Sequence, residues 1–478
     1  MTAIQQVLIH HSSSSGIQPD GNGPTLGPPN SCFVTHGDDR VSNANNDHPC
    51  FGIPDHSWQT NGTHMVSDGA DWLIPDHRNY NKVIVIGRGT STSSGGYPDQ
   101  VGNIGTLTGE QSAMLTQDQG VNWSESGLNM HNYTSNTNWT TWYDWATNGS
   151  MSDPVWIAVG GGFPSSAGYQ GDGNNIAIYK STNFTDWTRI LVTPDYTYGD
   201  QGNQFISCIC YSNGTWIIGN DPTGSICTST DDGATWSNWY TVSGAYLDAY
   251  TIASNNGGSK VMMAIQENHP THNKSIYYSS DSGATWDSGH EFKPGDFGVV
   301  INNIQYFDKQ IKVGTNTIGP GVWVVFGSHD NNCNWGGCSS TSELIYYSTD
   351  DGTSWTEIDV QNDVSPAAFY KGAGGELNKI IDTGQGKFIT WKWVGTQSLS
   401  YEKWYMSDES LTDWTEFASS VFSGVDMTTG GSSGTGSNSR DIIFCDNGTT
   451  KRLIACSGIG SSAAMAAGRV ATLDFVSV

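Results

Sequence analysis

Short apolar runs recur along this chain of 478 residues, and they have the length and composition of β-strands. They are rich in Val, Ile, Met and Trp, several end in Gly, and polar turn residues separate them. One family of runs occupies residues 83–87, 156–160, 216–219, 261–264, 322–327, 388–391 and 453–456. Continuous apolar runs of this kind predict strands that are buried on both faces. The pattern therefore predicts one such strand in each of seven repeating units.

A second set of strand-like runs leads into a recurring polar motif, Ser-x-Asp-x-Gly-x-Thr-Trp. Nearly complete copies occupy residues 229–236, 279–286 and 348–355, and looser copies end at Trp123, Trp187 and Trp414. An Asp side chain accepts hydrogen bonds from amides of its own turn, and Gly provides the positive φ that tight turns need. The spacing of about 50 to 70 residues between successive motif tryptophans fits one four-stranded propeller blade.

The motif resembles the Asp-box of sialidase-like β-propellers, also called the BNR repeat. The resemblance implies an all-β chain folded as a single propeller, with each box between the third and fourth strands of a blade and on the face opposite the ligand. Seven blades are expected, with six as the alternative. It also implies a structural role for the box residues Asp118, Gly120, Trp123, Trp187, Asp231, Gly233, Trp236, Asp281, Gly283, Trp286, Asp350, Gly352, Trp355 and Trp414.

The two ends of the chain are expected to meet. The last unit has no box and only the strand-like stretch 469–478, so it lacks one strand. An N-terminal segment such as residues 4–9 is expected to supply it and close the ring, which removes exposed sheet edges. Residues 1–80 are thus assigned to a closing strand and an irregular arm rich in Pro, Gly, Ser and His, and residues 81–478 to the propeller.

Composition restricts the partners. The formal net charge is −26, which disfavours nucleic acid, and no apolar run is long enough to cross a bilayer. The first residues lack the basic start and long apolar stretch of a secretory signal. An acidic β-protein rich in Gly, Ser, Thr and Asn is similar in composition to phage tail, fibre and capsid-decorating proteins. We therefore expect a virion or extracellular location, with other virion proteins or further copies of the chain as partners.

Neither histidine nor cysteine provides a clear cofactor site, and we expect no cofactor. Seven of the 12 histidines lie at or before His77, but without the spacing of a metal-binding motif, so polar loop histidines are favoured over a metal site. Among the nine cysteines, Cys333 and Cys338 fit either a small disulfide loop or two thiols. The cysteines within strand runs are expected to be small buried hydrophobic residues, and these are Cys208, Cys210, Cys227, Cys445 and Cys456.

Classical sialidase activity is not expected. Sialidases of the resembled superfamily hold a substrate carboxylate with three arginines from different blades. This chain has no arginine between Arg189 and Arg440, and the Phe/Tyr-Arg-Ile-Pro signature is missing. We assign no catalytic residue, although another glycosidase mechanism needs only two suitably spaced carboxylates and stays open.

Binding is the function that the loops favour. Long connections between second and third strands cover residues 89–111, 160–174, 266–274 and 327–343, on the face away from the boxes. The candidate ligand-binding residues in them are Tyr97, Phe163, Tyr169, His269, His272, His329, Asp330 and Trp335. A further aromatic stretch, residues 138–145, is interpreted as an outer strand whose rings pack between blades. The hypothesis is a non-enzymatic virion component that presents loops for assembly or host-glycan binding, and the alternative is a lectin-like or carbohydrate-active propeller.

Overall fold

The computed structural model describes the sheets of an all-β protein. The described residues are 31–35, 70–87, 113–124, 138–164, 176–190, 205–221, 224–242, 247–256, 258–267, 276–287, 289–290, 292, 299–330, 341–360, 363–364, 379–396, 399–419, 439–457 and 469–477. Within these ranges the regular elements are strands, and no helix occurs. No helix in the described residues could therefore span a membrane.

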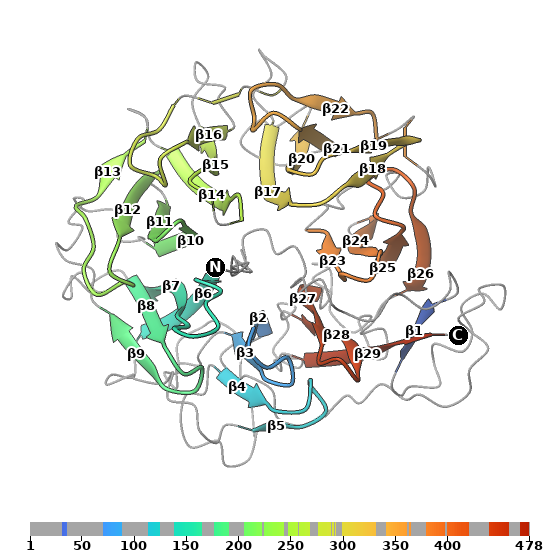
Figure 1. Cartoon of the computed structure of the whole chain (residues 1–478), viewed down its shortest axis with the longest axis horizontal. Coiled ribbons are helices and arrows are strands. Elements are labelled where there is room, and N and C mark those ends of the chain that lie inside the picture. The colour runs from blue at the N-terminus through green and yellow to red at the C-terminus, as the bar shows by residue number, and fades with distance from the viewer. Residues whose placement is uncertain are drawn as a thin grey trace, which may run out of the picture.

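Seven sheets surround a central axis (Figure 1). The first blade contains β2 (Ala70–Pro75), β3 (Val83–Gly87), β4 (Ala113–Thr116) and β5 (Trp123–Ser124). The second contains β6 (Asn138–Thr147), β7 (Trp156–Pro164), β8 (Ile176–Ser181) and β9 (Trp187–Ile190). The third contains β10 (Phe205–Ser212), β11 (Thr215–Asp221), β12 (Ser225–Ser229) and β13 (Tyr240–Thr241), and the fourth contains β14 (Leu247–Ser254), β15 (Val261–Glu267) and β16 (Ile276–Ser279).

The fifth blade contains β17 (Val299–Phe307), β20 (Val322–Asp330), β21 (Thr341–Ser348) and β22 (Thr356–Ile358). Between its first two strands, β18 (Ile311–Val313) and β19 (Asn316–Ile318) form a separate hairpin. The sixth contains β23 (Ile381–Asp382), β24 (Phe388–Thr396), β25 (Leu399–Ser407) and β26 (Thr415–Ser419). The last contains β27 (Ser439–Asp446), β28 (Lys451–Ser457), β29 (Arg469–Ser477) and β1 (Ser31–Thr35).

The prediction of a single β-propeller is confirmed. Six of the described sheets have four strands, and the fourth blade has three, with its fourth strand reduced to the bridge between Tyr278 and Asp287. All seven apolar runs identified in the sequence form the second strand of a sheet. One assignment was wrong, because the aromatic stretch 138–145 lies in β6, the first and innermost strand of its blade, instead of an outer strand. Its Trp145 is nevertheless fully buried between two blades.

The ring is closed by an N-terminal strand, as expected, but by a different segment. β1 pairs with β29 in antiparallel register, from Ser31 opposite Ser477 to Thr35 opposite Leu473. It provides the outermost strand of the last blade, whereas residues 4–9 lie outside the described residues. The propeller also starts before the predicted boundary at residue 81, because β2 already belongs to the first blade. That strand is a short apolar run that ends at Pro75, so its signal in the sequence is weak.

Each recurring motif forms a turn between the third and fourth strands, and we call these the repeat turns. In the copy at residues 229–236, Asp231 accepts hydrogen bonds from the amide of Thr235 (2.8 Å) and from its hydroxyl. The hydroxyl of Ser229 donates to Asp231 and accepts from the amide of Gly233 (2.9 Å). The Thr235 hydrogen bonds lower the pKa of Asp231 to about 2. The aspartate therefore holds its own turn together as a carboxylate.

In the repeat turn at residues 279–286, a glycine is required where the turn meets the neighbouring blade. Gly283 has a φ of +83°, which disfavours side chains. A Cβ atom at this position would lie 2.7 Å from Cδ1 of Ile217 in the preceding blade. Backbone conformation and interblade packing thus impose the same residue.

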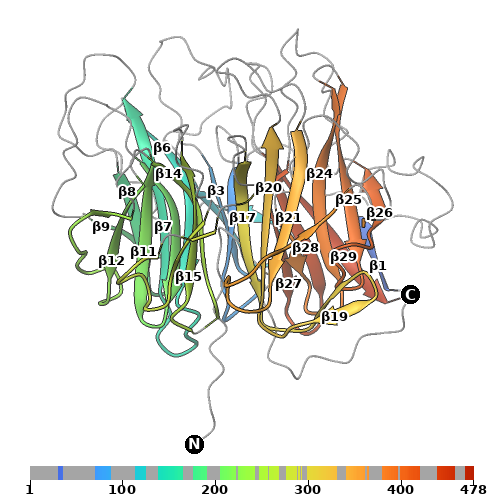
Figure 2. The ribbon, with the colours of Figure 1, turned by 90° about the horizontal axis from the view of Figure 1, so that it is seen from above.

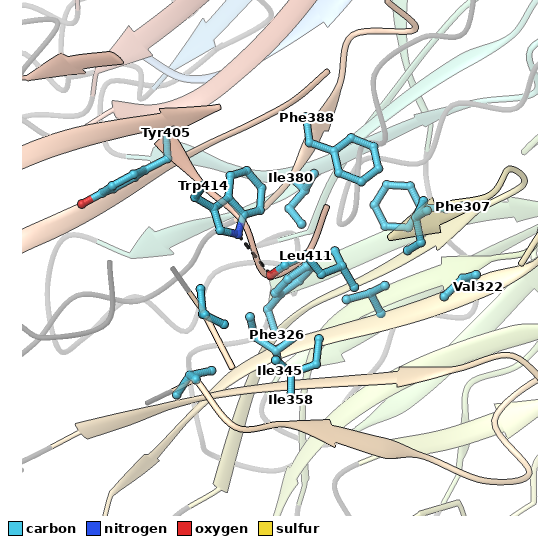
Figure 3. Packing of buried hydrophobic residues seen from close by; sticks show 14 residues of the cluster. Phe307, Val322, Phe326, Ile345, Ile358, Ile380, Phe388, Tyr405, Leu411 and Trp414 are labelled. Carbon is cyan, nitrogen blue, oxygen red and sulfur yellow. Dashed lines mark hydrogen bonds between the residues drawn. The ribbon is translucent and has the colours of Figure 1, made fainter. Parts of the chain in front are cut away.

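The hydrophobic core is divided among the seams between blades. One cluster joins the second and third blades through Ile157, Val159, Trp216 and Ile218. Figure 3 shows the corresponding cluster between the fifth and sixth blades, where the Trp414 indole donates to the carbonyl of Leu411 (3.1 Å). The predicted behaviour of the strand cysteines is confirmed, since all five named above are buried and unbridged. Cys333 and Cys338 lie outside the described residues.

A buried histidine occupies the seam between the first and second blades. The Nε2 atom of His77 lies 2.9 Å from the carbonyl oxygen of Ser150, and its ring centroid lies 4.8 Å from that of Trp156. Burial lowers the pKa of His77, the Ser150 hydrogen bond and Asp76 oppose this shift, and Arg78 adds to it. The neutral imidazole is therefore the form that the folded protein favours.

We expect His77 to make the protein less stable in mild acid. Because its folded pKa lies below the unfolded value of about 6.5, the unfolded state binds more protons near that pH. The stability it contributes is present above the unfolded pKa and is lost as pH falls toward the folded pKa. The thermal midpoint of the wild type should fall more steeply from pH 7 to pH 5 than that of His77→Gln. Parallel profiles of the two proteins would contradict the assignment.

Candidate functional site

A β-bulge recurs near the start of the innermost strand in six of the seven described blades. In each case one residue is skipped between two consecutive pairs with the second strand. The skipped residues, which we call the bulge ring, are Asp71, Tyr143, Ser207, Tyr250, Asn302 and Arg440. The pairs that follow the bulges lie at matching positions along the second strands, for example Asp144 with Val159 and Cys208 with Gly219. The bulges therefore lie at one level around the axis.

This level is near the loop face, defined as the face where the second strands connect to the third. The first strands lie nearest the axis in Figure 1. Figure 2 shows the sheets from the side, with the hairpin that carries β19 at the opposite, turn face. Since each innermost strand runs from the loop face to the turn face, bulges near its start lie toward the loop face. Bulges bend a strand and redirect its residues, and they are frequent beside binding and active sites.

The structure describes one side chain of the bulge ring, that of Ser207. It is half-buried, and its hydroxyl lies 3.4 Å from the carbonyl oxygen of Gly219. For the other five members the structure describes the backbone position and pairing. Their residue types are two tyrosines, an aspartate, an asparagine and an arginine.

Two buried aspartates lie directly after the bulges of the second and last blades. Asp144 accepts hydrogen bonds from the amides of Trp145 (2.8 Å) and, across the seam, Ile209 (2.9 Å). Asp441 makes the same contacts with the amides of Ile442 (2.8 Å) and Leu73 (2.8 Å). Each carboxylate thus joins its own blade to the next one, and Asp441 does so where the ring closes.

A lysine completes this buried group. Lys379, only 4% exposed, forms a hydrogen-bonded ion pair with Asp441. Burial raises the pKa of Asp144 well above its usual range, the two amide hydrogen bonds oppose the rise, Asp441 adds to it and Lys379 lowers it. The ionisation of Asp144 is therefore coupled to the Lys379–Asp441 pair.

The chemistry of this buried group is structural. Both carboxylates are fully buried and bind backbone amides of adjacent blades. A glycosidase needs one carboxyl group that reaches the leaving oxygen and another that reaches water or the sugar. Asp144 and Asp441 have neither access. In the described part of the chain, no group of three or more His, Cys, Asp or Glu side chains is arranged for a metal ion.

The predicted ligand-binding residues are only partly placed. Phe163 lies near the loop-face end of β7, opposite Trp139, and His329 and Asp330 end β20, opposite Ser342 and Thr341. Their side chains, and all of Tyr97, Tyr169, His269, His272 and Trp335, lie outside the described residues. The roles of these eight residues stay predictions.

The bulge ring is absent from the sequence-based list of candidates. Its members precede their second strands by different distances, because the hairpins between first and second strands differ in length. The fifth blade even inserts β18 and β19 there. The sequence alone therefore does not show that these residues occupy equivalent positions in their blades, whereas the strand pairing does.

Of three comparisons with known proteins, the one with solved structures gives matches. No family model matches, and neither does any curated protein. Among solved structures, YCF48 bound to a D1 peptide is 10% identical, with 96% of this chain and 99% of that chain covered and a TM-score of 0.43. The polysaccharide lyase Uly1 is 10% identical, with 95% and 98% covered and a TM-score of 0.44.

An ancestral GH74 enzyme is 12% identical, with 85% of this chain covered and a TM-score of 0.47. The match spans 45% of that enzyme. At these identities and TM-scores, none of the three bears on the activity or ligand of this chain.

Proposed function

We propose that this chain is a non-enzymatic, glycan-binding β-propeller whose binding site is centred on the bulge ring. The observation that carries the proposal is the recurrence of the bulge at one level in six described blades. Tyrosine rings stack on the apolar faces of sugars, and carboxylate, amide and guanidinium groups hydrogen-bond sugar hydroxyls. Small-ligand sites commonly combine a few such polar groups with aromatic ones in a concave place.

The state of the buried aspartates supports binding over hydrolysis. The carboxyl groups of Asp144 and Asp441, which directly follow two of the bulges, bind backbone amides, and Asp441 also pairs with Lys379. They fix the relative positions of the blades that carry the bulges. A rigid ring is suited to holding a ligand in one orientation, since less entropy is lost on binding.

We further propose that the protein acts at the surface of a virion, with other virion proteins or further copies of itself as partners. The net charge of −26 and the composition rich in Gly, Ser, Thr and Asn support this location. Mass spectrometry of gradient-purified particles from the source material tests it. Stoichiometric recovery with particles is expected, whereas recovery only in the soluble fraction, with sugar release from polysaccharides, would favour the glycosidase alternative.

Replacing the ring tyrosines is expected to weaken glycan binding. Tyr143→Ala and Tyr250→Ala should each raise Kd for a bound glycan about tenfold or more, as for removal of an aromatic hot-spot residue. Affinity is measured on an immobilised glycan panel and then by calorimetry. Asn316→Ala is the control, because Asn316 is exposed on β19 at the turn face. Equal affinities of the wild type and both tyrosine variants, or no glycan binding at all, would overturn the proposed site.

A further inference from the structure

The ion pair between Lys379 and Asp441 is buried on both sides. It lies in the seam between the sixth and last blades, since Lys379 is two residues before β23 and Asp441 belongs to β27. In the pair between Lys387 and Asp408, by contrast, the aspartate side chain is largely exposed. At Lys379 and Asp441, an amine and a carboxyl group are therefore held in contact and out of water.

The backbone around the lysine is fixed by neighbouring strands. The carbonyl of Lys379 accepts a hydrogen bond from the hydroxyl of Thr390 in the sixth blade (2.7 Å). The next residue, Ile380, donates its amide to Oε1 of Gln305 in the fifth blade (2.7 Å), and its carbonyl accepts from Nε2 of the same side chain (2.7 Å). These contacts hold the base of the lysine side chain in one place.

The two carboxyl oxygens of Asp441 have different partners. Oδ1 contacts Nζ of Lys379 and accepts a hydrogen bond from the amide of Ile442 (2.8 Å). Oδ2 accepts a hydrogen bond from the amide of Leu73 (2.8 Å). A fixed backbone N–H stabilises negative charge that develops on the oxygen it faces. The Leu73 amide is therefore placed to support a nucleophilic attack on Cγ of Asp441.

We infer that Lys379 and Asp441 form an isopeptide bond, which links the sixth blade to the last one covalently. The ammonium group of Lys379 first gives one proton to Oδ1 of Asp441, which leaves an amine and a carboxylic acid. Nζ then attacks Cγ, and Oδ2 takes the negative charge opposite the Leu73 amide. Nζ gives a second proton to Oδ1, the bond between Cγ and Oδ1 breaks, and Oδ1 leaves as water. The products are one amide and one water, so no ligand or co-reactant has to enter the seam.

Two properties of the site favour this bond. The ion pair keeps two charges away from water, which is costly, whereas the amide product has no charge. The amine and the carboxyl group are also in contact before they react, and this contact replaces the encounter that amide formation in solution requires. The Leu73 amide keeps its acceptor, because Oδ2 becomes the oxygen of the new amide. Chains in which the bond has not formed are held by the ion pair alone.

Peptide mapping of the full wild-type chain by tandem mass spectrometry tests the inference. The protein is stored folded and is denatured only for digestion with trypsin, which does not cleave after an acylated lysine. Residues 372–387 are expected to be joined to residues 441–451, and the branched peptide should be lighter than its two parts by one water. Recovery of these segments only as separate, unbranched peptides would overturn the inference.

The intact mass alone does not decide the question. The chain with the bond should be lighter than its sequence by one water, but an Asp-Gly sequence also loses water when it forms a succinimide. Lys379→Arg separates the two, because it keeps a positive charge beside Asp441 and has no amine that can form the amide. This variant should lack the branched peptide and have the full mass of its sequence.

The exposed pair between Lys387 and Asp408 is the control within the same digest. Water stabilises its charged groups, so residues 404–440 should be recovered without a branch. Equal branching at both pairs would show that contact alone, without burial, produces the bond, and would overturn the argument from the site. The wild-type digest requires no variant to fold, and its result does not depend on whether a glycan binds.

Discussion

Asp441→Ala is expected to lower the free energy of unfolding by about 3–5 kcal/mol, the usual cost of breaking a buried ion pair by removing one partner. The substitution leaves the buried ammonium of Lys379 without the carboxylate it contacts. It also removes the acceptor for the Leu73 amide, which belongs to the first blade although it lies 368 residues away in sequence. Three blades therefore lose a shared contact at the place where the ring closes. Urea denaturation followed by circular dichroism measures the change.

An exposed ion pair in the neighbouring sixth blade provides the matched control. Lys387 pairs with Asp408, whose side chain is 69% exposed. Asp408→Ala should cost less than about 1 kcal/mol, because solvent screens surface pairs. Asp441→Asn, which keeps an oxygen for one of the two backbone amides and loses the charge, should fall between the two. A loss for Asp441→Ala as small as that for Asp408→Ala would show that the blades close without this contact.

A double variant separates the ion pair from the rest of the network. Lys379→Met with Asp441→Leu removes both charges, so no buried charge is left uncompensated. We expect it to be more stable than Asp441→Ala, although the amides of Leu73 and Ile442 still lose their acceptor. If the double variant is the less stable protein, the contacts to the backbone outweigh the charge pairing.

The fold was largely predictable because its strongest signals are local. The apolar second strands and the repeat turns each fit within a few residues, so periodicity and turn chemistry identify them without knowledge of the partner strands. Closure of the ring by an N-terminal strand was predicted correctly, but it was assigned to the wrong segment. The pairing of β1 with β29 joins opposite ends of the chain. The register of such a distant pair has little signal in a short strand of mixed composition.

The candidate site was much less predictable. A bulge is a property of two paired strands, so Tyr143 or Tyr250 looks like any other strand residue until the register is known. Likewise, Asp144 and Asp441 cannot be distinguished by sequence from the other acidic residues, since their roles depend on amides in the next blade. Sequence reasoning turned to the loops because binding residues concentrate there. The structure adds the strand-borne positions at the axis.

One sequence rule does become clear from the structure. Where a second strand carries Trp at its start and the repeat turn carries Asp-Asp-Gly, the indole bonds the second aspartate of that turn. Trp216 donates to Asp232 (3.1 Å), and Trp323 donates to Asp351 (3.2 Å). The fourth blade has Val261 and Ser282 in the corresponding places. The Trp of the second strand and the second Asp of the repeat turn thus occur together in a blade because they form a hydrogen bond.

Trp216→Ala is therefore expected to cost about 3–5 kcal/mol, the range for removing a large buried aromatic side chain. The ring of Trp216 is fully buried in the seam between the second and third blades, and its centroid lies 4.9 Å from that of Tyr211. Trp216→Phe keeps much of the apolar area and loses the hydrogen bond to Asp232, so it should cost clearly less. Urea denaturation again measures both variants.

A Trp→Phe substitution at Trp323 tests whether the seams contribute independently to the free energy of unfolding. It is equally buried, lies 4.9 Å from the Tyr306 ring, and belongs to the seam between the fourth and fifth blades. The two tryptophans share no contact in their clusters, so the losses for Trp216→Phe and Trp323→Phe should add within about 0.5 kcal/mol in the double variant. A double variant that loses much more than the sum would show that one weakened seam loosens the others, as expected if closure couples the whole ring. Additivity would instead mean that each seam is stabilised by its own contacts. The contacts of Asp441 with Lys379 and with the Leu73 amide would then be the place where a single substitution opens the ring.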